Sequence, residues 1–311
     1  MSEYSYRVFG LNIRSEIRLP ELRPALDTDQ VDITILRAGI HAEPPADAKS
    51  VRLGRSWGRN ILLEHPLAGR MLATEYATLH VEQKHGVPER NVRAFILGPG
   101  LAAAIYSIGK VPIHVSGLLI SGQVYAFTGP SGVGKSTLTA FLNKKYGFPI
   151  FTDDVAMVHS VSSTEHGILL HAGPPRIKLW EDALEQLNIP KHGLTRDTTR
   201  HNKYHLTLPR PDETEKCQPL HALVYISRTA NAPRTPLLKK PGGFALFQMA
   251  MNSIYRPELA GMAGDKAILI NAIKQITSAA CYVFEGSNSF DDIDYEMDWL
   301  HEHILAANSM D

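Results

Sequence analysis

The stretch Gly129-Pro130-Ser131-Gly132-Val133-Gly134-Lys135-Ser136-Thr137 fits the phosphate-binding-loop pattern G-x-x-x-x-G-K-[ST] at every fixed position. Its glycines permit positive φ and let backbone N–H groups approach phosphate oxygens. We expect Lys135 to reach the β- and γ-phosphates of a nucleotide and the Ser136 hydroxyl to bind Mg²⁺. The predicted phosphate-binding residues are Gly129, Ser131, Gly132, Val133, Gly134, Lys135, Ser136 and Thr137, of which Thr137 is the less favoured metal ligand.

The segments on either side of the loop predict a strand before it and a helix after it. Residues 124–128 form a short β-prone run that ends at the first glycine, and residues 136–142 carry an apolar stripe at helical spacing. The loop is therefore expected at a helix N-terminus, where free N–H donors and the helix dipole favour anions. This context indicates an α/β fold. It also disfavours the alternative that the stretch is an ordinary glycine-rich turn that matches the pattern by chance.

An acidic pair follows the next expected strand. Residues 149–152 read as a strand that ends at Asp153-Asp154, 18 and 19 positions after Lys135. A phosphate-loop enzyme can place a metal-binding or proton-accepting carboxylate there, although an Asp-Asp surface turn would look the same in sequence. Neighbouring side chains alternate along a strand, so the two aspartates need not share a role. We assign Asp153 as the catalytic base and Asp154 to the metal, and the reverse assignment stays open.

Composition excludes several classes of protein. The 311 residues have 44% hydrophobic content, which suits about two folded domains, and 32 basic residues balance 32 acidic ones. This balance gives no global field for nucleic acid or an anionic membrane. The apolar runs are too short to span a bilayer, the N-terminus has no apolar leader, and Cys217 and Cys281 lack a disulfide-like spacing. We expect a cytoplasmic protein with no membrane partner.

The chain divides into a β-rich module at residues 1–95 and a loop-containing domain at residues 96–311. Nothing in the first module resembles a catalytic motif, and substrate recognition is an expectation for it. Its expected strands are residues 6–13, 31–37, 61–64, 71–75 and 79–83. At the boundary we expect a strand at 92–96, a turn at 98–100 and a helix at 101–108.

The second domain alternates strands and helices. The expected strands are residues 113–116, 118–121, 155–159, 168–171, 220–227 and 280–285, and the expected helices are 181–187, 243–255, 265–277 and 291–307. Arg176 and Lys178 would point to one side of an extended segment, either toward phosphate or an acidic substrate or as an ordinary charged strand edge. The polar stretch 192–219 reads as a mobile segment.

From about residue 95 onward the sequence resembles the HPr serine kinase/phosphorylase family, and more closely its HPr-kinase-related members, which include kinases encoded with lasso-peptide biosynthesis genes. The resemblance lies in the run from His114-Val115-Ser116-Gly117-Leu118 to the loop, in the acidic pair, and in Arg176-Ile177-Lys178-Leu179-Trp180. The opening Tyr6-Arg7-Val8-Phe9-Gly10-Leu11 extends it over almost the whole chain.

The resemblance implies further features of fold and chemistry. It implies a core related to the phosphoenolpyruvate carboxykinase-type nucleotide-binding fold, ATP and Mg²⁺ as cofactors, and a functional histidine at His114, 21 residues before Lys135. The family's later catalytic arginine has Arg200 and Arg256 as candidates. The parent family forms hexamers, so a homo-oligomer is an open expectation. The chain lacks a glycine-containing signature of the type Glu-Ile-Arg-Gly-Leu-Gly after the acidic pair, which puts HPr itself and the reverse phosphorolysis in doubt.

Three functions compete at this point. The first is an ATP-dependent serine kinase that phosphorylates a peptide or small protein, with a lasso-peptide precursor as one such acceptor, through Lys135, Asp153, Asp154 and His114. The second is an ATPase or switch, but the chain has no LSGGQ-like signature and Asn202-Lys203-Tyr204-His205 fails the NKxD pattern. The third is a binding module with a degenerate loop, which the intact Lys135, Ser136 and acidic pair disfavour. A small-molecule kinase also stays open, because the sequence offers no readable acceptor pocket.

Overall fold

The computed structural model describes residues 3–26, 30–51, 53–159, 168–197, 200–209, 217–229, 235–260, 266–287 and 289–305. Packing divides the chain into two compact units. Unit 1 comprises Met1–Pro112 and Ile254–Ala272, and unit 2 comprises Ile113–Ser253 and Ile273–Asp311. Both units contain helices and sheet, so the protein has a mixed α/β fold with several sheets, as the sequence predicts.

Unit 1 is built on an eight-stranded sheet in the order β1-β2-β3-β8-β7-β6-β5-β4. The β2–β3 and β3–β8 pairs are parallel and the others are antiparallel. The strands are β1 (Tyr4–Val8), β2 (Leu11–Ser15), β3 (Ile33–Arg37), β4 (Lys49–Val51), β5 (Gly54–Trp57), β6 (Asn60–His65), β7 (Gly69–Ala73) and β8 (Thr78–Gln83). The single strand expected at 6–13 is a β1–β2 hairpin, because Phe9 and Gly10 both adopt positive φ and turn the chain.

The helices of unit 1 include the clearest errors of the sequence prediction. Of residues 92–96, expected as a strand, the first four belong to α1 (Glu89–Phe95) and Ile96 begins the π-helix η1 (Ile96–Gly100), which also contains the expected turn at 98–100. Val92 and Phe95 are buried at helical spacing, which a five-residue apolar run cannot distinguish from a strand. The expected helix at 101–108 is confirmed as α2 (Leu101–Ser107). The short α6 (Pro257–Ala260) and the first part of α7 (Lys266–Ile276) also belong to this unit.

The helix α2 packs on β6, β7 and β8, which is why the first unit continues to Pro112. The domain boundary expected at residue 95 stays a prediction.

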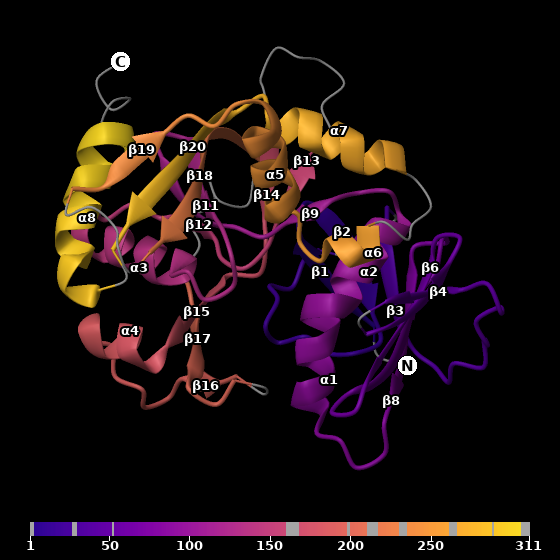
Figure 1. Cartoon of the computed structure of the whole chain (residues 1–311). Helices are drawn as coiled ribbons and strands as arrows, with labels where there is room; N and C mark the ends of the chain where they lie inside the picture. Colours follow the sequence, from indigo (N-terminus) through magenta and orange to yellow (C-terminus); the bar gives the residue numbers. More distant parts are fainter. Residues whose placement is uncertain are drawn as a thin grey trace. The chain divides into compact units, whose positions relative to one another are not determined.

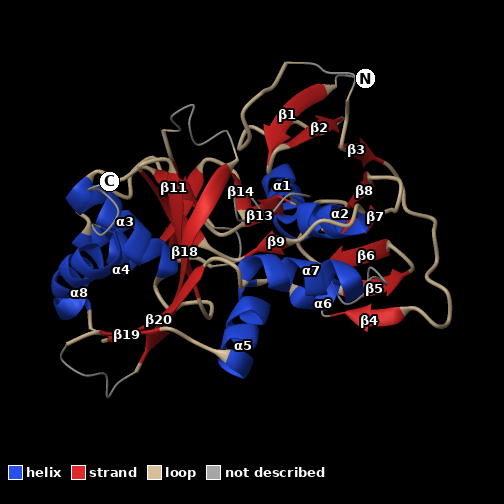
Figure 2. Ribbon diagram, turned by 90° about the horizontal axis from the view of Figure 1, so that it is seen from above, coloured by secondary structure: helices blue, strands red, loops and turns tan. Residues whose placement is uncertain are grey.

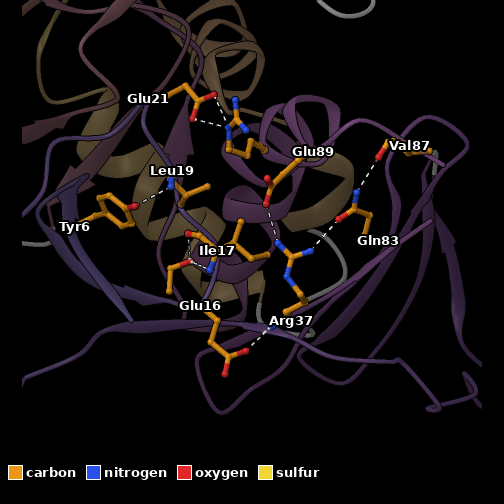
Figure 3. A network of polar contacts seen from close by, with 11 residues as sticks. Tyr6, Glu16, Ile17, Leu19, Glu21, Arg37, Gln83, Val87 and Glu89 are labelled. Atoms are coloured by element: carbon orange, nitrogen blue, oxygen red, sulfur yellow. Dashed lines mark hydrogen bonds and ion pairs between the residues drawn. The ribbon is translucent and has the colours of Figure 1, made fainter. Parts of the chain in front are cut away.

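A polar network joins the sheet of unit 1 to α1 (Figure 3). The Arg37 guanidinium donates to Gln83 Oε1 and to Glu89 Oε1, both at 2.8 Å, and the Arg37 backbone N–H donates to Glu16 Oε2. Arg37 therefore connects β3, β8 and the start of α1 through one planar group.

Unit 2 contains a nine-stranded mixed sheet with the main order β12-β10-β11-β18-β14-β13-β9, to which β20 and β19 add beside β18. The strands are β9 (Pro112–Ile113), β10 (Ser116–Ile120), β11 (Gln123–Thr128), β12 (Ile150–Thr152), β13 (Ala156–His159), β14 (Leu169–Ala172), β18 (Gln218–Arg228), β19 (Leu237–Lys239) and β20 (Ala280–Gly286). The strands β11, β18 and β20 are parallel neighbours (Figure 1). The expected hairpin of 155–159 and 168–171 is confirmed, while its connection at 160–167 lies outside the described residues.

Helices cover the phosphate-loop side of this sheet. The helix α3 (Lys135–Tyr146) packs on β10, β11 and β12 and against α8 (Ile293–Leu300), and α4 (Glu181–Gln186) packs on β15 (Arg176–Trp180). Figure 2 shows α3, α4 and α8 together beside β11 and β18. The core on this side includes Leu118, Phe127, Leu138, Val224 and Met297. The strand–loop–helix order predicted around the glycine-rich stretch is confirmed.

A small three-stranded sheet, β15-β17-β16, lies beyond β12 in the chain. The stretch 192–219, expected as a mobile segment, contains β16 (Thr195–Arg196) and β17 (Lys203–Thr207) in antiparallel pairing with each other and with β15. Tyr204 and Leu206 alternate with the polar residues Lys203, His205 and Thr207 and pack into the core, so the two-residue period of a strand outweighs the polar composition. Residues 198–199 and 210–216 of that stretch lie outside the described residues.

The C-terminal third follows the predicted order of helices and strand. The helices α5 (Gly243–Ser253) and α7 (Lys266–Ile276) correspond to the expected 243–255 and 265–277, and α8 with the π-helix η5 (His301–Leu305) corresponds to 291–307. A 3₁₀ turn, η4 (Phe290–Asp292), precedes α8. Residues 265, 306 and 307 of these predictions lie outside the described residues. None of the helices within the described ranges is long and apolar enough to cross a membrane.

Candidate phosphate-binding site

The glycine-rich loop leaves β11 and ends at the first residue of α3. Gly129, Gly132 and Gly134 have φ values of 140°, 89° and 97°, as their expected role requires. A Cβ at Gly129 would also lie 2.8 Å from the carbonyl oxygen of Ile226, so the approach of β18 independently requires glycine there. No acidic residue stands in the first turn of α3, and the N–H groups of that turn have no partner within the helix.

Lys135 is buried and folds back over its own loop. Its ammonium donates to the carbonyl oxygens of Gly129 and Pro130 at 2.9 and 3.1 Å. Burial lowers the pKa of Lys135 to about 8, although Asp154 and Asp153 favour the charged form. A bound phosphate would supply the counter-charge that this buried ammonium needs.

Asp153 is connected to the loop through a buried serine. Ser116, at the start of β10, donates its hydroxyl proton to Asp153 Oδ1 at 2.5 Å, and its oxygen lies 3.5 Å from Ser136 Oγ. The other carboxylate oxygen of Asp153 accepts the Lys178 backbone N–H at 2.9 Å. Asp153 is only 3% exposed, so these donors replace the water that a carboxylate requires.

Asp154 points into a different environment. It has a φ of 72°, which turns its side chain away from the strand alternation. Its Oδ2 accepts the Lys178 ammonium at 2.7 Å, and its Oδ1 lies 3.7 Å from His114 Nε2. Burial alone would raise the pKa of Asp154, but the Lys178 ammonium, with a smaller effect of Arg176, holds it well below its usual range. Burial and then Lys135 lower the pKa of His114 to about 4, so this imidazole is neutral at neutral pH.

The small sheet places further cations beside the acidic pair. Arg176 and Lys178 alternate with the buried Ile177 and Leu179, so they share one face of β15 as predicted. Lys203 on β17 pairs in register with Trp180, and its ammonium lies 5.4 Å from the Trp180 ring centre. Burial lowers the pKa of Lys203, whereas Asp153 and Asp154 raise it. Among the described residues, neither the Lys203 ammonium nor the Arg176 guanidinium has a hydrogen-bonding partner.

The two arginine candidates of the sequence lie elsewhere. Arg200 is exposed in the turn between β16 and β17, where its backbone N–H donates to Asp197 Oδ1. Arg256 belongs to unit 1, where it lies 3.8 Å from Glu258 and over the ring of Tyr255. The described site therefore brings together the loop, Asp153, Asp154, His114, Arg176 and Lys178, and it does not bring in Arg200 by a side-chain contact.

Three residues of the site carry no role in the sequence analysis. Ser116 stands in the run quoted for the family resemblance, but a buried serine has no sequence signal of its own. Lys203 could have been found from the alternation of charged and apolar residues in β17. Arg228 ends β18 and donates from Nε to the loop carbonyl of Val133, and it could have been found as the charged residue that ends an apolar strand, a signal that Asp153 also gives.

The oxygen atoms near the loop suit a hard cation. In the part of the chain that the structure describes, no three His, Cys, Asp or Glu side chains gather to ligate a metal. Mg²⁺ with a nucleotide needs only one or two protein oxygens, because phosphates and water supply the others. Ser136 Oγ, Ser116 Oγ and the Asp153 carboxylate form such a set of oxygens, so the residues fit the Mg²⁺ that the sequence predicts.

No protein-family model matches the sequence, and no curated protein matches it. Among solved structures, the chain is similar to the HPr(Ser) kinase/phosphatase from Coxiella burnetii, with 11% identity and a TM-score of 0.32 over 63% of this chain and 97% of that one. A likeness this low carries no functional argument, so membership of the family stays a prediction.

Proposed function

We propose that the protein is an ATP-dependent kinase that transfers the γ-phosphate to a hydroxyl of a peptide or small protein, a serine in particular. A strand–loop–helix with three positive-φ glycines, a buried lysine at the helix start and two aspartates beside it supports this proposal. Phosphoryl transfer requires mainly positioning and neutralisation of charge, and both are supplied here. A lasso-peptide precursor is one acceptor of this kind, and the cytoplasm is the compartment that the composition favours.

The observation that carries the proposal is the separation of the two aspartates. Asp153 is hydrogen-bonded to Ser116, which in turn lies beside Ser136 of the loop, whereas Asp154 faces Lys178 and His114. One carboxylate thus belongs to the metal side and the other to the acceptor side. We therefore propose Asp153 for the metal and Asp154 for the base, which reverses the assignment favoured by sequence.

The loop and the cations divide the work of charge neutralisation. The backbone N–H groups of residues 132–136 and the Lys135 ammonium bind the β- and γ-phosphates. On binding, Lys135 gives up its hydrogen bonds to the Gly129 and Pro130 carbonyl oxygens and donates to phosphate oxygens instead. Ser136 and Asp153 would hold Mg²⁺, which supplies further neutralisation of the phosphate oxygens when bound. Arg176 and Lys203, which lie on the small sheet beside the acidic pair, would approach the transferred group.

Asp154 acts on the acceptor hydroxyl. Its low pKa keeps it ionised at neutral pH, so it can accept a hydrogen bond from the hydroxyl and orient the oxygen toward the γ-phosphorus. The proton passes to Asp154 as the new O–P bond forms and the bond to the departing ADP oxygen breaks. His114, which is neutral, orients the carboxylate or the acceptor.

The test is transfer of labelled γ-phosphate from ATP with Mg²⁺ to peptides and small proteins encoded beside this gene, resolved by mass spectrometry. We expect phosphoserine on one of them with the wild type and with Asp182→Asn, which lies outside the site on α4, and none with Lys135→Ala or Asp154→Asn. Release of phosphate with no labelled acceptor would contradict the kinase and favour an ATPase.

A further inference from the structure

Arg228 approaches the loop from the strand beside it. It is the last residue of β18, which runs parallel to β11 with Thr128 level with Tyr225, so the end of β18 reaches the start of the loop. The Arg228 Nε donates to the carbonyl oxygen of Val133 at 3.3 Å. A Cβ at Gly134 would lie 3.8 Å from the same nitrogen, so the guanidinium lies along the loop backbone.

Two further elements hold this guanidinium in place. Arg228 donates to Glu296 Oε2 on α8 at 2.6 Å and to the carbonyl oxygen of Ser287 after β20. Glu296 Oε1 accepts the Ser287 backbone N–H at 2.5 Å. The Arg228 and Glu296 side chains are 13% and 2% exposed, so the ion pair is almost completely excluded from solvent. Each partner also has a hydrogen bond to the backbone of Ser287.

Glycine at 286 makes room for the pair. A Cβ built on Gly286 would collide with Glu296 Oε1, so the close approach of α8 to the end of β20 depends on the missing side chain. A buried ion pair stabilises a fold weakly, because desolvation offsets its Coulomb attraction. The accommodation of this pair next to the loop indicates a role other than stability.

That role follows from the geometry of the peptide unit. In a planar trans peptide the C=O and the following N–H point in opposite directions. The Arg228 guanidinium has only donors, so it holds the Val133 carbonyl oxygen on its own side of the peptide. The Gly134 N–H therefore points to the opposite side, away from the guanidinium. This is one of the N–H groups that a phosphate-binding loop uses.

We propose that Arg228, fixed by Glu296, is a positioning residue that holds the 133–134 peptide in the phosphate-binding orientation and thereby sets nucleotide affinity without contacting the nucleotide. The inference rests on the proposed function, because it requires that the loop bind nucleotide phosphates. It predicts that affinity and folding stability respond differently to changes at this pair.

The experiment compares three variants by calorimetric titration with ATP and Mg²⁺ and by urea unfolding. Arg228→Lys keeps a cation for Glu296 but cannot bridge Glu296, Ser287 and Val133 with one planar group. Arg228→Met leaves Glu296 buried without its partner, and the double variant Arg228→Met with Glu296→Met replaces the pair by apolar groups. Lys145→Met and Asp298→Asn break the 2.8 Å ion pair between α3 and α8 away from the loop, and they serve as matched controls.

We expect Arg228→Lys and the double variant to stay close to wild type in urea midpoint. Both should lose about 10- to 100-fold in ATP affinity, the size of one hydrogen bond from the Gly134 N–H to a charged phosphate. Arg228→Met should lose affinity and stability together, and the controls should keep wild-type affinity. Wild-type affinity in Arg228→Lys, or affinity that returns with stability in the double variant, would overturn the inference. Absence of ATP binding by the wild type would instead overturn the proposed function.

Discussion

At the scale of single residues, the site depends on two adjacent carboxylates with different surroundings. Asp153 is buried and accepts the Ser116 hydroxyl and the Lys178 backbone N–H, while Asp154 accepts the Lys178 ammonium. Strand alternation alone would separate the two side chains, and the positive φ of Asp154 adds a turn that no pattern in the sequence announces. The proposed division of roles therefore rests on a backbone conformation that the sequence pattern does not predict.

The division of roles gives the first prediction. Asp154→Asn cannot take the hydroxyl proton, so kcat should fall by about 10²- to 10⁴-fold with little change in the KM for ATP. Asp153→Asn should instead raise the Mg²⁺ concentration for half-maximal rate by about 10- to 100-fold. Steady-state rates over a series of Mg²⁺ concentrations measure both. The opposite pattern, with Mg²⁺ dependence altered only in Asp154→Asn, would restore the assignment made from sequence.

Ser116 gives the second prediction. Ser116→Ala removes one donor from a buried carboxylate, so we expect a loss of about 1 to 3 kcal/mol in the free energy of unfolding. Ser107→Ala is the control, because Ser107 is also fully buried but donates only to the Ala104 carbonyl of its own helix. Urea unfolding of both variants checks this, and equal losses would show that the hydroxyl of Ser116 contributes nothing through Asp153.

At the level of helices and strands, the sequence predicts elements that have a regular alternation or a loop motif. It does not predict elements whose type depends on packing against the rest of the fold. The strands β11 and β12, the helix α3 and the extended run of Arg176 and Lys178 follow directly from their patterns. The strand predicted at 92–96 is wrong because buried residues at Val92 and Phe95 suit a helix packed on a sheet as well as a strand. The strand β17 was not predicted, because the polar composition of the segment outweighed the short apolar alternation of Tyr204 and Leu206.

The strand β18 carries the third prediction, which concerns acid stability. Burial against Tyr125 lowers the pKa of His221 from its ordinary value of 6.5. The unfolded chain then binds more protons than the folded chain between the lowered pKa and 6.5, so stability rises with pH across that window and is lost as pH falls. His114 and His205 shift in the same direction. His221→Phe should therefore show a smaller fall in urea midpoint between pH 7.5 and pH 5 than wild type.

One result would contradict the role proposed for His221. An equal fall in wild type and His221→Phe would mean that His221 titrates alike in the folded and unfolded chains. A parallel variant, His80→Phe, changes a half-buried histidine on β8 of unit 1 and should leave the pH dependence of unit 2 as it is.

At the scale of the whole molecule, the chain enters unit 2 at Ile113, returns to unit 1 at Ile254 and re-enters unit 2 at Ile273. No composition shift marks these crossings, because each unit has an ordinary apolar core and short connections. A sequence read in order assigns one boundary to a two-domain chain, so the return of residues 254–272 could not be foreseen. All the loop, acidic-pair and cation residues of the candidate site, from His114 to Arg228, nevertheless belong to unit 2.

Equilibrium binding of ATP with Mg²⁺ to the wild type, Lys135→Ala and Lys144→Ala is the most direct test of the role of the glycine-rich loop. Lys144 is an exposed lysine on the same helix and controls for the loss of one charge. We predict that Lys135→Ala binds about 10- to 100-fold more weakly than wild type while Lys144→Ala binds equally well. Equal affinity in Lys135→Ala, or no binding by the wild type, would contradict the assignment of this loop as the nucleotide site.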